Sequence, residues 1–343
     1  MIRDRRAMLI VLTLAALHLA AIFAGFIAPY GFADQNRDLA FAPPVRPRFV
    51  DSSGHLHFRP FVYGIRLHPG SFSDYEPDPA HVYRVRFFVT GEPYSILGVG
   101  NLRLHLFGVD APGRILLLGG DGFGRDLFSR LVYGARISLF AGLLAAGLSL
   151  GIGLLLGAFS GYYGGRWDTL IMRLTELFMA LPWLYLLLGI RAFLPLRVSS
   201  GDAFLLLIAV MGLVGWARPA RLVRGVVLSA RERAYVLAAR GFGASDTYLL
   251  RRHVLPHAFG VVLTQAALLI PQYILAEVTL SFLGLGVAEP VPSWGNMLAD
   301  LQQYHILVSY WWMLTPGLAL VPVFLAYYVL ANRLHQRLKF VLQ

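Results

Sequence analysis

The sequence predicts an all-α polytopic membrane protein with six transmembrane helices and a small β-rich extracytoplasmic insert. Hydrophobic residues make up 57% of the 343 residues, charged residues make up 14%, and the mean hydropathy is +0.61. These values lie outside the range of soluble globular domains. Several apolar runs are also long enough to cross a bilayer core of about 30 Å as a helix. The chain has no cysteine, which excludes disulfides and thiolate metal sites.

The formal net charge of +11 could indicate a nucleic-acid partner. The excess of arginine lies beside the apolar runs, however, where it orients membrane helices by the positive-inside rule. We therefore expect a lipid bilayer, and no nucleic acid, around this chain. The ten histidines form no HExxH pair or comparable ligand spacing, so no metal site is predicted.

The first apolar run covers residues 7–28 and follows a short basic stretch with Arg3, Arg5 and Arg6. A signal peptide is the alternative, but its apolar region usually has about 7–15 residues. We expect residues 1–30 to form an uncleaved N-terminal transmembrane helix that starts in the cytoplasm.

Residues 31–118 differ in composition from the rest of the chain. They are rich in proline, glycine and aromatic residues, and their acids nearly balance their arginines, which suits the extracytoplasmic side. Residues 82–89 and 102–107 alternate in polarity and predict strands, and residues 55–61 are a weaker candidate. A long loop without structure of its own is uncommon, so we expect a β-rich insert here.

Residues 119–343 are expected to form the transmembrane core. Five further spans are predicted, at residues 137–165, 169–193, 203–217, 258–283 and 306–332. Prolines within these spans predict kinks, at Pro182, Pro271, Pro316 and Pro322. Arg173 and Glu176 have the spacing of an i,i+3 ion pair. With six spans, both termini lie in the cytoplasm.

A basic stretch at residues 218–257 follows the fourth predicted span and carries eight arginines against two acids. Four of its residues recur at helical spacing and predict one helix face: Tyr235, Ala238, Ala239 and Phe242. Gly243 interrupts this pattern, and residues 244–246 offer an N-cap for a second helix over 247–253 that ends at Pro256. Two short helices with small residues at their corner would let another protein dock closely.

The pattern Ala238-Ala239-xxx-Gly243, followed by His253-x-Leu255-Pro256, resembles the cytoplasmic EAA loop of binding-protein-dependent ABC importer permeases. In that family the loop inserts into a cleft of the ATPase subunit. The glutamate that opens the family motif is Leu237 here, which we interpret as altered tuning of the contact. The resemblance implies an ATPase-coupling loop 218–257 with nine site residues: Leu237, Ala238, Ala239, Gly243, Ala244, Ser245, Asp246, His253 and Pro256. A loop that only determines topology is the alternative, but it would not require these spacings.

Two further segments resemble the C-type subunit of the dipeptide/oligopeptide branch of that family. Residues 119–139 resemble the pattern GTDxxGRDxxSRxxYGxRxSL, and residues 281–298 contain SFLGLG and PSWGNML. In the first segment we expect a turn at the glycines and local pairing among Arg125, Asp126 and Arg130. A phosphate-binding loop is not expected there, because a preceding strand and a Lys-Ser/Thr ending are missing.

The predicted span 258–283 and the second segment supply candidate residues of the transport pathway or helix bundle: Glu277 in the span, and Ser281, Trp294 and Asn296 in the segment. A charge within a span usually faces the protein interior or water. Glu277 could therefore form a structural hydrogen bond or line the pathway, and both interpretations stay open. Pro292 and Ser293 predict the start of a short helix at Trp294.

The resemblance implies a type I ABC importer permease architecture in the bacterial inner membrane. It implies import of dipeptides or oligopeptides, with three kinds of partner: a homologous second permease, one or two cytoplasmic ABC ATPases and an extracytoplasmic binding protein. No GxxxxGK[ST] motif is present, so no catalytic residue and no bound cofactor are expected, and ATP and Mg²⁺ belong to the ATPases. The insert either seats the binding protein or packs on the second permease.

Other functions stay open at this point. The same assembly could carry nickel chelates or other small solutes. A secondary transporter driven by an ion gradient would need a coupling-ion site and usually shows inverted repeats. No such repeat is visible, and the intramembrane acids are few. A membrane scaffold that holds the insert is a third hypothesis.

Overall fold

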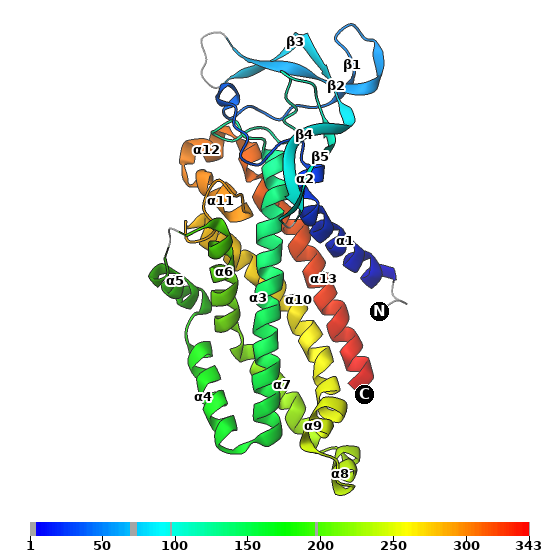
Figure 1. Ribbon diagram of the computed structural model, residues 1–343, viewed down its shortest axis with the longest axis vertical. Helices are drawn as coiled ribbons and strands as arrows, with labels where there is room; N and C mark the ends of the chain where they lie inside the picture. Colours follow the sequence, from blue (N-terminus) through cyan, green and yellow to red (C-terminus); the bar gives the residue numbers. More distant parts are fainter. Residues whose placement is uncertain (1–4, 69–73, 97, 196–197, 343) are drawn as a thin grey trace. The chain divides into compact units, whose positions relative to one another are not determined.

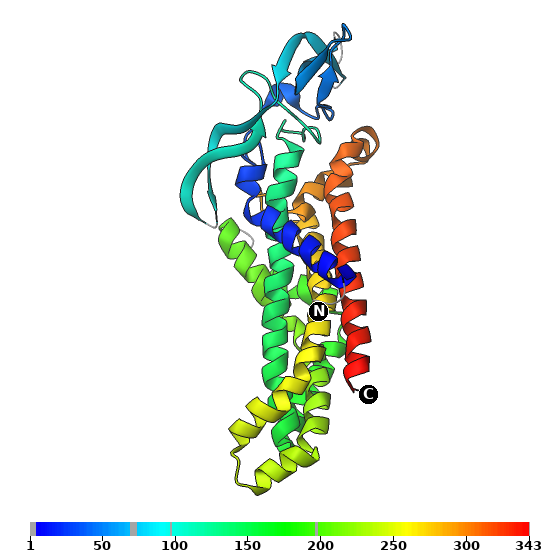
Figure 2. The same cartoon turned by 90° about the vertical axis from the view of Figure 1, so that its right-hand side faces the viewer.

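The computed structural model describes residues 5–68, 74–96, 98–195 and 198–342, so Arg3 lies outside the described residues. The chain divides into two compact units, and Figure 1 labels its strands and helices while Figure 2 shows them from a second side. The helical unit comprises Met1–Leu14, Phe140–Leu280 and Pro322–Gln343, and the mixed unit comprises Ala15–Leu139 and Ser281–Val321. The boundaries at residues 30 and 118 remain predictions.

The mixed unit contains two antiparallel sheets. One has the order β1-β2-β3, with β1 at Arg48–Val50, β2 at Leu56–Leu67 and β3 at Tyr75–Arg84. The other is a hairpin of β4 at Arg86–Ile96 and β5 at Val99–Gly108. Strands therefore occur at predicted residues 102–107 and over most of residues 55–61.

The prediction of a single strand over residues 82–89 is wrong. The chain leaves the first sheet after β3 and enters the hairpin at β4, with Val85 between them. The backbone N–H of Val85 donates to the carbonyl oxygen of Pro60, 2.8 Å away. Its side chain is buried with Val62 and Ile115. Both interactions turn the chain inward between β3 and β4, and alternation of polarity alone does not reveal them.

The N-terminal helix is shorter than predicted. Helix α1 covers Arg5–Ile22, and a separate short helix α2 covers Ala24–Ile27. Carbonyl oxygens at a helix end have no partner within the helix. Here Arg136 donates to those of Ala21 and Ile22, with distances of 3.1 and 2.9 Å. This arginine stabilises the end of α1 within the apolar run.

Short helices complete the mixed unit. They are the 3₁₀ turn η1 (Arg37–Leu39), α11 (Trp294–Ala299), the 3₁₀ turn η3 (Asp300–Gln302), α12 (Tyr304–Ser309) and the 3₁₀ turn η4 (Trp311–Leu314). Leu127, Met297, Ile306, Trp312 and Met313 form their buried core.

Long helices form most of the helical unit. Four helices continue from one unit into the other: α1, α3 (Leu127–Tyr163), α10 (Leu255–Phe282) and α13 (Thr315–Leu342). The others are α4 (Gly165–Ala180), α5 (Trp183–Phe193), α6 (Ser200–Gly215), α7 (Ala217–Arg231), α8 (Ala234–Gly241) and α9 (Asp246–Leu249), and a π turn at Leu250–Val254 precedes α10.

Among the described residues, three helices are long and apolar enough to cross a membrane: Leu127–Tyr163, Asp246–Phe282 and Trp311–Gln336. Two bent pairs, α4 with α5 and α6 with α7, raise the number to at most five. The apolar part of α1, Ala7–Ile22, is shorter. The count of six spans therefore stays a prediction.

Two predicted spans differ in detail. The helix expected over 169–193 is not kinked but broken, with 90° between α4 and α5. Leu181 adopts an extended conformation at φ −84° and ψ 137°, as expected for a residue before proline. The span expected to begin at Ile306 begins later, at Trp311, because residues 304–309 form the separate helix α12.

Candidate functional site

The arginine-rich segment, residues 218–257, rests on the last turns of α3 in the helical unit. Gly153, Gly157 and Gly161 recur every four residues along α3 and face α7. A Cβ atom on Gly157 would lie 2.4 Å from the carbonyl oxygen of Ala220. Glycine at this spacing lets two helix backbones approach closely, so α7 has one fixed position against α3.

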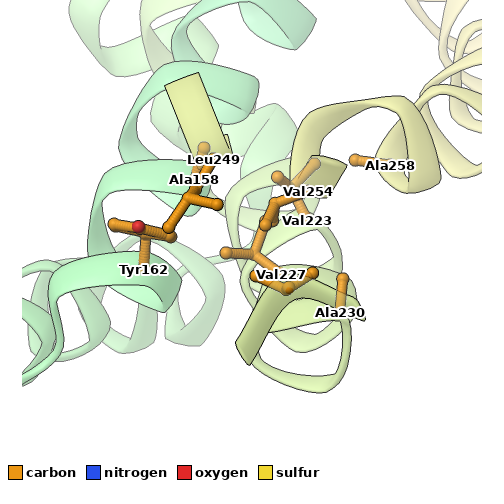
Figure 3. Packing of buried hydrophobic residues seen from close by; sticks show 9 residues of the cluster. Ala158, Tyr162, Val223, Val227, Ala230, Leu249, Val254 and Ala258 are labelled. Carbon is orange, nitrogen blue, oxygen red and sulfur yellow. The ribbon is translucent and has the colours of Figure 1, made fainter. Parts of the chain in front are cut away.

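A hydrophobic cluster holds the short helices of this segment in place (Figure 3). Val236 of α8, Leu249 of α9 and Val254 of the π turn each have no exposed surface. They pack with residues of α3, α7 and α10: Ala158, Tyr162, Val223, Val227, Ala230 and Ala258. The segment is thus a folded part of the helical unit.

Tyr162 of α3 is the polar centre of this contact. Its hydroxyl donates to Asp246 Oδ1 at 2.7 Å and accepts from Arg240 Nη2 at 3.1 Å. Beside it, Arg231 donates to the carbonyl oxygens of Gly161 and Tyr162, both at 3.0 Å. One buried phenol therefore ties α8 and the start of α9 to α3.

A bidentate ion pair joins α4 to α7. Arg224 Nε and Nη2 lie 2.5 and 2.6 Å from the two carboxylate oxygens of Asp168, and the Ser160 hydroxyl also donates to Asp168. Two parallel bonds of this kind fix geometry as well as charge. On the same α4, the predicted pair of Arg173 with Glu176 forms at 2.8 Å with both side chains exposed.

The corner between α8 and α9 is built as the sequence suggests. Gly243 has φ +84°, which only glycine adopts without strain. The N–H of Ala244 donates to the carbonyl oxygen of Ala239. This hydrogen bond encloses six residues, as in a Schellman motif. Ser245 then caps α9, since its hydroxyl accepts from the N–H of Tyr248.

The second helix does not end at Pro256 as predicted. Residues Asp246–Phe282 form one continuous helix in the structure. The π turn displaces the backbone just ahead of Pro256, where the N–H of Leu255 donates to the carbonyl oxygen of Leu250. Proline has no N–H and its ring crowds the preceding turn of a regular α-helix, and Pro256 follows shortly after the wider π turn.

Apolar side chains are exposed at this corner, beside the exposed Arg240 and Asp246. Phe242 is 93% exposed, and Leu237, Ala238, Tyr235 and Tyr248 are exposed around it. Leu237 therefore points outward, although the resembling motif has glutamate there. His253 lies between the rings of Tyr235 and Tyr248, at 5.9 and 5.5 Å, and His257 hydrogen bonds to the Tyr235 hydroxyl.

A pocket of about 280 Å³ opens at the two bends of the helical unit. It is lined by Phe178, Leu181, Trp183, Gly215, Gln272 and Tyr273, among others. The Tyr273 hydroxyl donates to Ser149 Oγ at 3.0 Å. A Cβ atom on Gly215 would lie 1.6 Å from that hydroxyl, so the tyrosine position depends on this glycine.

The four candidate pathway residues are buried or half-buried. Glu277 has no exposed surface in the helical unit. In the mixed unit, Ser281 is buried close to Gly286. Trp294 is buried too, and its N–H and Nε1–H donate to Ser138 Oγ and to the Leu131 carbonyl oxygen at 3.1 and 3.0 Å.

The helix start predicted at Trp294 is confirmed, and Ser293 and Asn296 form a capping box there. Asn296 also donates to the carbonyl oxygens of Val287 and Val291, at 3.1 and 2.9 Å. Trp294 and Asn296 therefore fix backbone in the mixed unit.

The pairing expected among Arg125, Asp126 and Arg130 is wrong, because both arginines pair with other carboxylates. Arg125 pairs with Asp121, and both Arg125 and Arg130 reach Glu289, at 2.6 and 2.7 Å. Asp126 instead accepts from the N–H and hydroxyl of Ser129. Burial raises the pKa of Asp126 to about 6, although the hydrogen bonds from Ser129 oppose this shift.

Several residues of the site carry no recognisable sequence signal. Tyr162, Arg224 and Tyr273 lie in ordinary helical surroundings, and their partners are between 56 and 124 residues away. The spacing of Gly153, Gly157 and Gly161 is the one signal that could have revealed the contact of α3 with α7.

Two protein families match the chain. Residues 153–340 match the family described as binding-protein-dependent transport system inner membrane component. Residues 1–44 match the N-terminal TM domain of oligopeptide transport permease C.

Several curated relatives are named as peptide transport permeases. The chain is 41% identical over 196 residues, 57% of its length, to the dipeptide transport system permease protein DppC of Bacillus subtilis (strain 168). It is 41% identical over 189 residues, 55% of its length, to the oligopeptide transport system permease protein OppC of the same organism. These matches span 59% and 60% of the two relatives. A putative peptide transport system permease protein of Brucella suis is 42% identical over 210 residues, 61% of this chain and 68% of the relative.

Among solved structures, the inward-facing MetNI methionine ABC transporter matches 61% of this chain and 95% of its own chain. The sequence identity is 18% and the TM-score is 0.47.

Proposed function

Because the chain belongs to the family of binding-protein-dependent transport system inner membrane components, we propose that it is the permease subunit of an ATP-driven importer of dipeptides or oligopeptides. The chain is a multi-pass inner-membrane protein. In this proposal a homologous second permease completes the pathway, an extracytoplasmic binding protein delivers the peptide, and both termini lie in the cytoplasm. The names of these relatives, as dipeptide, oligopeptide and peptide transport permeases, support a peptide cargo.

The observation that carries the proposal is the exposed apolar corner of α8 and α9. Phe242 is 93% exposed on a segment that is otherwise fixed by a buried cluster and by Tyr162. Exposed apolar groups on a rigid support are typical of protein–protein interfaces. We assign this corner to contact with one or two cytoplasmic ABC ATPases, which bind the ATP and Mg²⁺.

The coupling residues have distinct roles in this proposal. Leu237, Ala238 and Phe242 contact the ATPase, and Gly243 with Ser245 sets the angle between α8 and α9. Asp246 anchors the corner to α3 through Tyr162. His253 supports the aromatic face of Tyr235, and Pro256 lies in the turn by which the corner continues into α10.

Motion of this corner would reach the membrane helices through rigid connections. The α3–α7 glycine contact and the Arg224–Asp168 pair join α3, α4 and α7. The bends at Leu181 and Trp216 are places where helices can change direction, and the pocket beside them is the candidate segment of the peptide pathway. Glu277 is proposed to face the bundle.

Co-purification tests this proposal. The tagged chain is solubilised from its own membrane in mild detergent and its partners are identified by mass spectrometry. We expect a second permease and at least one ATPase. Phe242→Ser should lose the ATPase and keep the permease, whereas the control Tyr304→Ser, exposed in the mixed unit, should keep both. Recovery of the chain alone, stable and monodisperse, would favour a secondary transporter.

A further inference from the structure

The β4–β5 hairpin ends in an apolar tip to which the proposed function gives no role. From Tyr94 to Leu102 the sequence has no charged residue. Val99 is 75% exposed and Leu102 is 44% exposed. Removing aliphatic surface from water is favourable by about 25 cal/mol per Å², so this tip is suited to an apolar surface.

Contacts within the mixed unit show the direction of the hairpin. At its base, the Phe107 ring lies 5.9 Å from that of Phe128 in the first turn of α3. Nearer the tip, His105 Nδ1 is 2.6 Å from the carbonyl oxygen of Ala28. Nearer still, the Tyr94 ring lies against Gly25, where a Cβ atom would be 2.2 Å away. The hairpin thus follows α2 back towards α1 (Figure 2).

The end of α1 marks where the apolar region begins. Arg136 of α3 donates to the carbonyl oxygens of Ala21 and Ile22, so these residues lie at the same depth along the membrane normal. Beyond Arg136, residues 137–165 of α3 carry no charge, and α1 is apolar throughout residues 7–22. Residues 1–44 also match an N-terminal TM domain. This level is therefore the edge of the membrane on this side.

The hairpin is long enough to reach that level. Gly25 and Ile22 are three residues apart across the junction of α1 and α2, and three residues of helix span about 4.5 Å at 1.5 Å per residue. Ile96 lies about 7 Å beyond Tyr94 along a strand at 3.4 Å per residue. Because Tyr94 lies at the level of Gly25, the Ile96–Val99 pair reaches the level of Ile22 and Arg136.

We propose that the tip residues Tyr94, Ile96, Val99 and Leu102 lie in the headgroup region of the lipid bilayer, as a membrane contact additional to the helices. A two-stranded hairpin leaves backbone groups unpaired at its edges, which hydrocarbon does not tolerate. The interface, about 5–10 Å deep, supplies both water and apolar surface. Tyrosine is enriched at this level. Arg103, exposed directly after Leu102, is placed to meet lipid phosphates.

Site-specific fluorescence tests the proposal, since the chain has no cysteine of its own. Val99→Cys and Leu102→Cys are each labelled with an environment-sensitive NBD group in the full chain and reconstituted in phosphatidylcholine nanodiscs. The matched control is Phe58→Cys, 99% exposed in β2 of the same unit. Each variant must elute as one monodisperse species.

We expect lipids with a headgroup spin label to reduce fluorescence at least twofold at positions 99 and 102, and iodide to quench little there. At position 58 iodide should quench strongly and spin-labelled lipid should not. Iodide quenching at both tip positions equal to that at position 58, without lipid quenching, would place the tip in water and overturn the proposal. Protection from both quenchers would reveal a protein partner and overturn it as well.

Discussion

Tyr162→Phe should loosen the arginine-rich segment without disturbing its hydrophobic packing. The change removes the hydroxyl that donates to Asp246 and accepts from Arg240, and it keeps the ring within the buried cluster. A hydrogen bond to a charged group contributes about 1.5–3 kcal/mol. Asp246 and Arg240 have 57% and 48% of their side chains exposed, so water replaces much of the loss.

The expected net loss is about 1–2 kcal/mol for the two bonds together, below the sum of two such contributions because both charged partners are about half exposed to water. Such a loss corresponds to about 5–30-fold more frequent local opening. The frequency of this opening is measured by hydrogen exchange of the backbone amides of α8 and of Ala244–Leu249 in the purified chain. The matched control is Tyr163→Phe, because Tyr163 is the adjacent residue and is 51% exposed.

Unchanged exchange in Tyr162→Phe would refute the role of this phenol as the anchor of the segment. Equal acceleration in both variants would refute it too, because the effect would then not depend on the buried hydroxyl.

Three further predictions concern other parts of the site. Gly215→Ala should displace Tyr273, whose hydroxyl lies 1.6 Å from the new Cβ position, and lower stability by about 1–3 kcal/mol; a melting temperature in detergent equal to that of the unmodified chain would contradict this. Arg224→Lys should cost about 1–3 kcal/mol, because an ammonium group cannot form both bonds to Asp168, and an unchanged melting temperature would show the pair to be dispensable. Burial raises the pKa of Asp126 from 3.8 to about 6, so the folded chain binds this proton more tightly and loses stability as the pH rises through that interval. Asp126→Asn should remove this dependence and stabilise the chain at pH 7 by up to about 3 kcal/mol; a melting temperature that falls with pH as steeply as before would exclude this carboxyl as the cause.

Local features of the fold were predictable because neighbouring residues determine them. The turn at Gly243, the cap at Ser245 and the capping box at Ser293 follow from backbone geometry over three to six residues. The helix end predicted at Pro256 is wrong, because a local feature without a sequence signal precedes the proline. A π turn just upstream accommodates the proline, and no residue type signals that turn.

Features that depend on distant partners were not predictable from one sequence. Apolar periodicity predicts that residues 169–193 are helical, but it does not show that the chain turns by 90° at Leu181. Likewise, Arg125 and Arg130 find their partner in Glu289, 159 or more residues away. The closeness of these charges in sequence predicted a local network with Asp126. In the structure, the buried Asp126 carboxyl accepts from the N–H and hydroxyl of Ser129 at the start of α3.

Crosslinking at position 242 tests directly whether the corner around Phe242 contacts an ATPase. Phe242→Cys introduces one cysteine into a chain that has none, and a short bifunctional maleimide–photoreactive reagent is applied to membranes in which all partners are present. We expect a crosslink to a nucleotide-binding protein whose yield changes when ATP is trapped with vanadate, and no such crosslink from Phe58→Cys. A Phe242→Cys variant that is fully labelled by the reagent and yields no ATPase crosslink in any nucleotide state would show that this corner does not contact an ATPase.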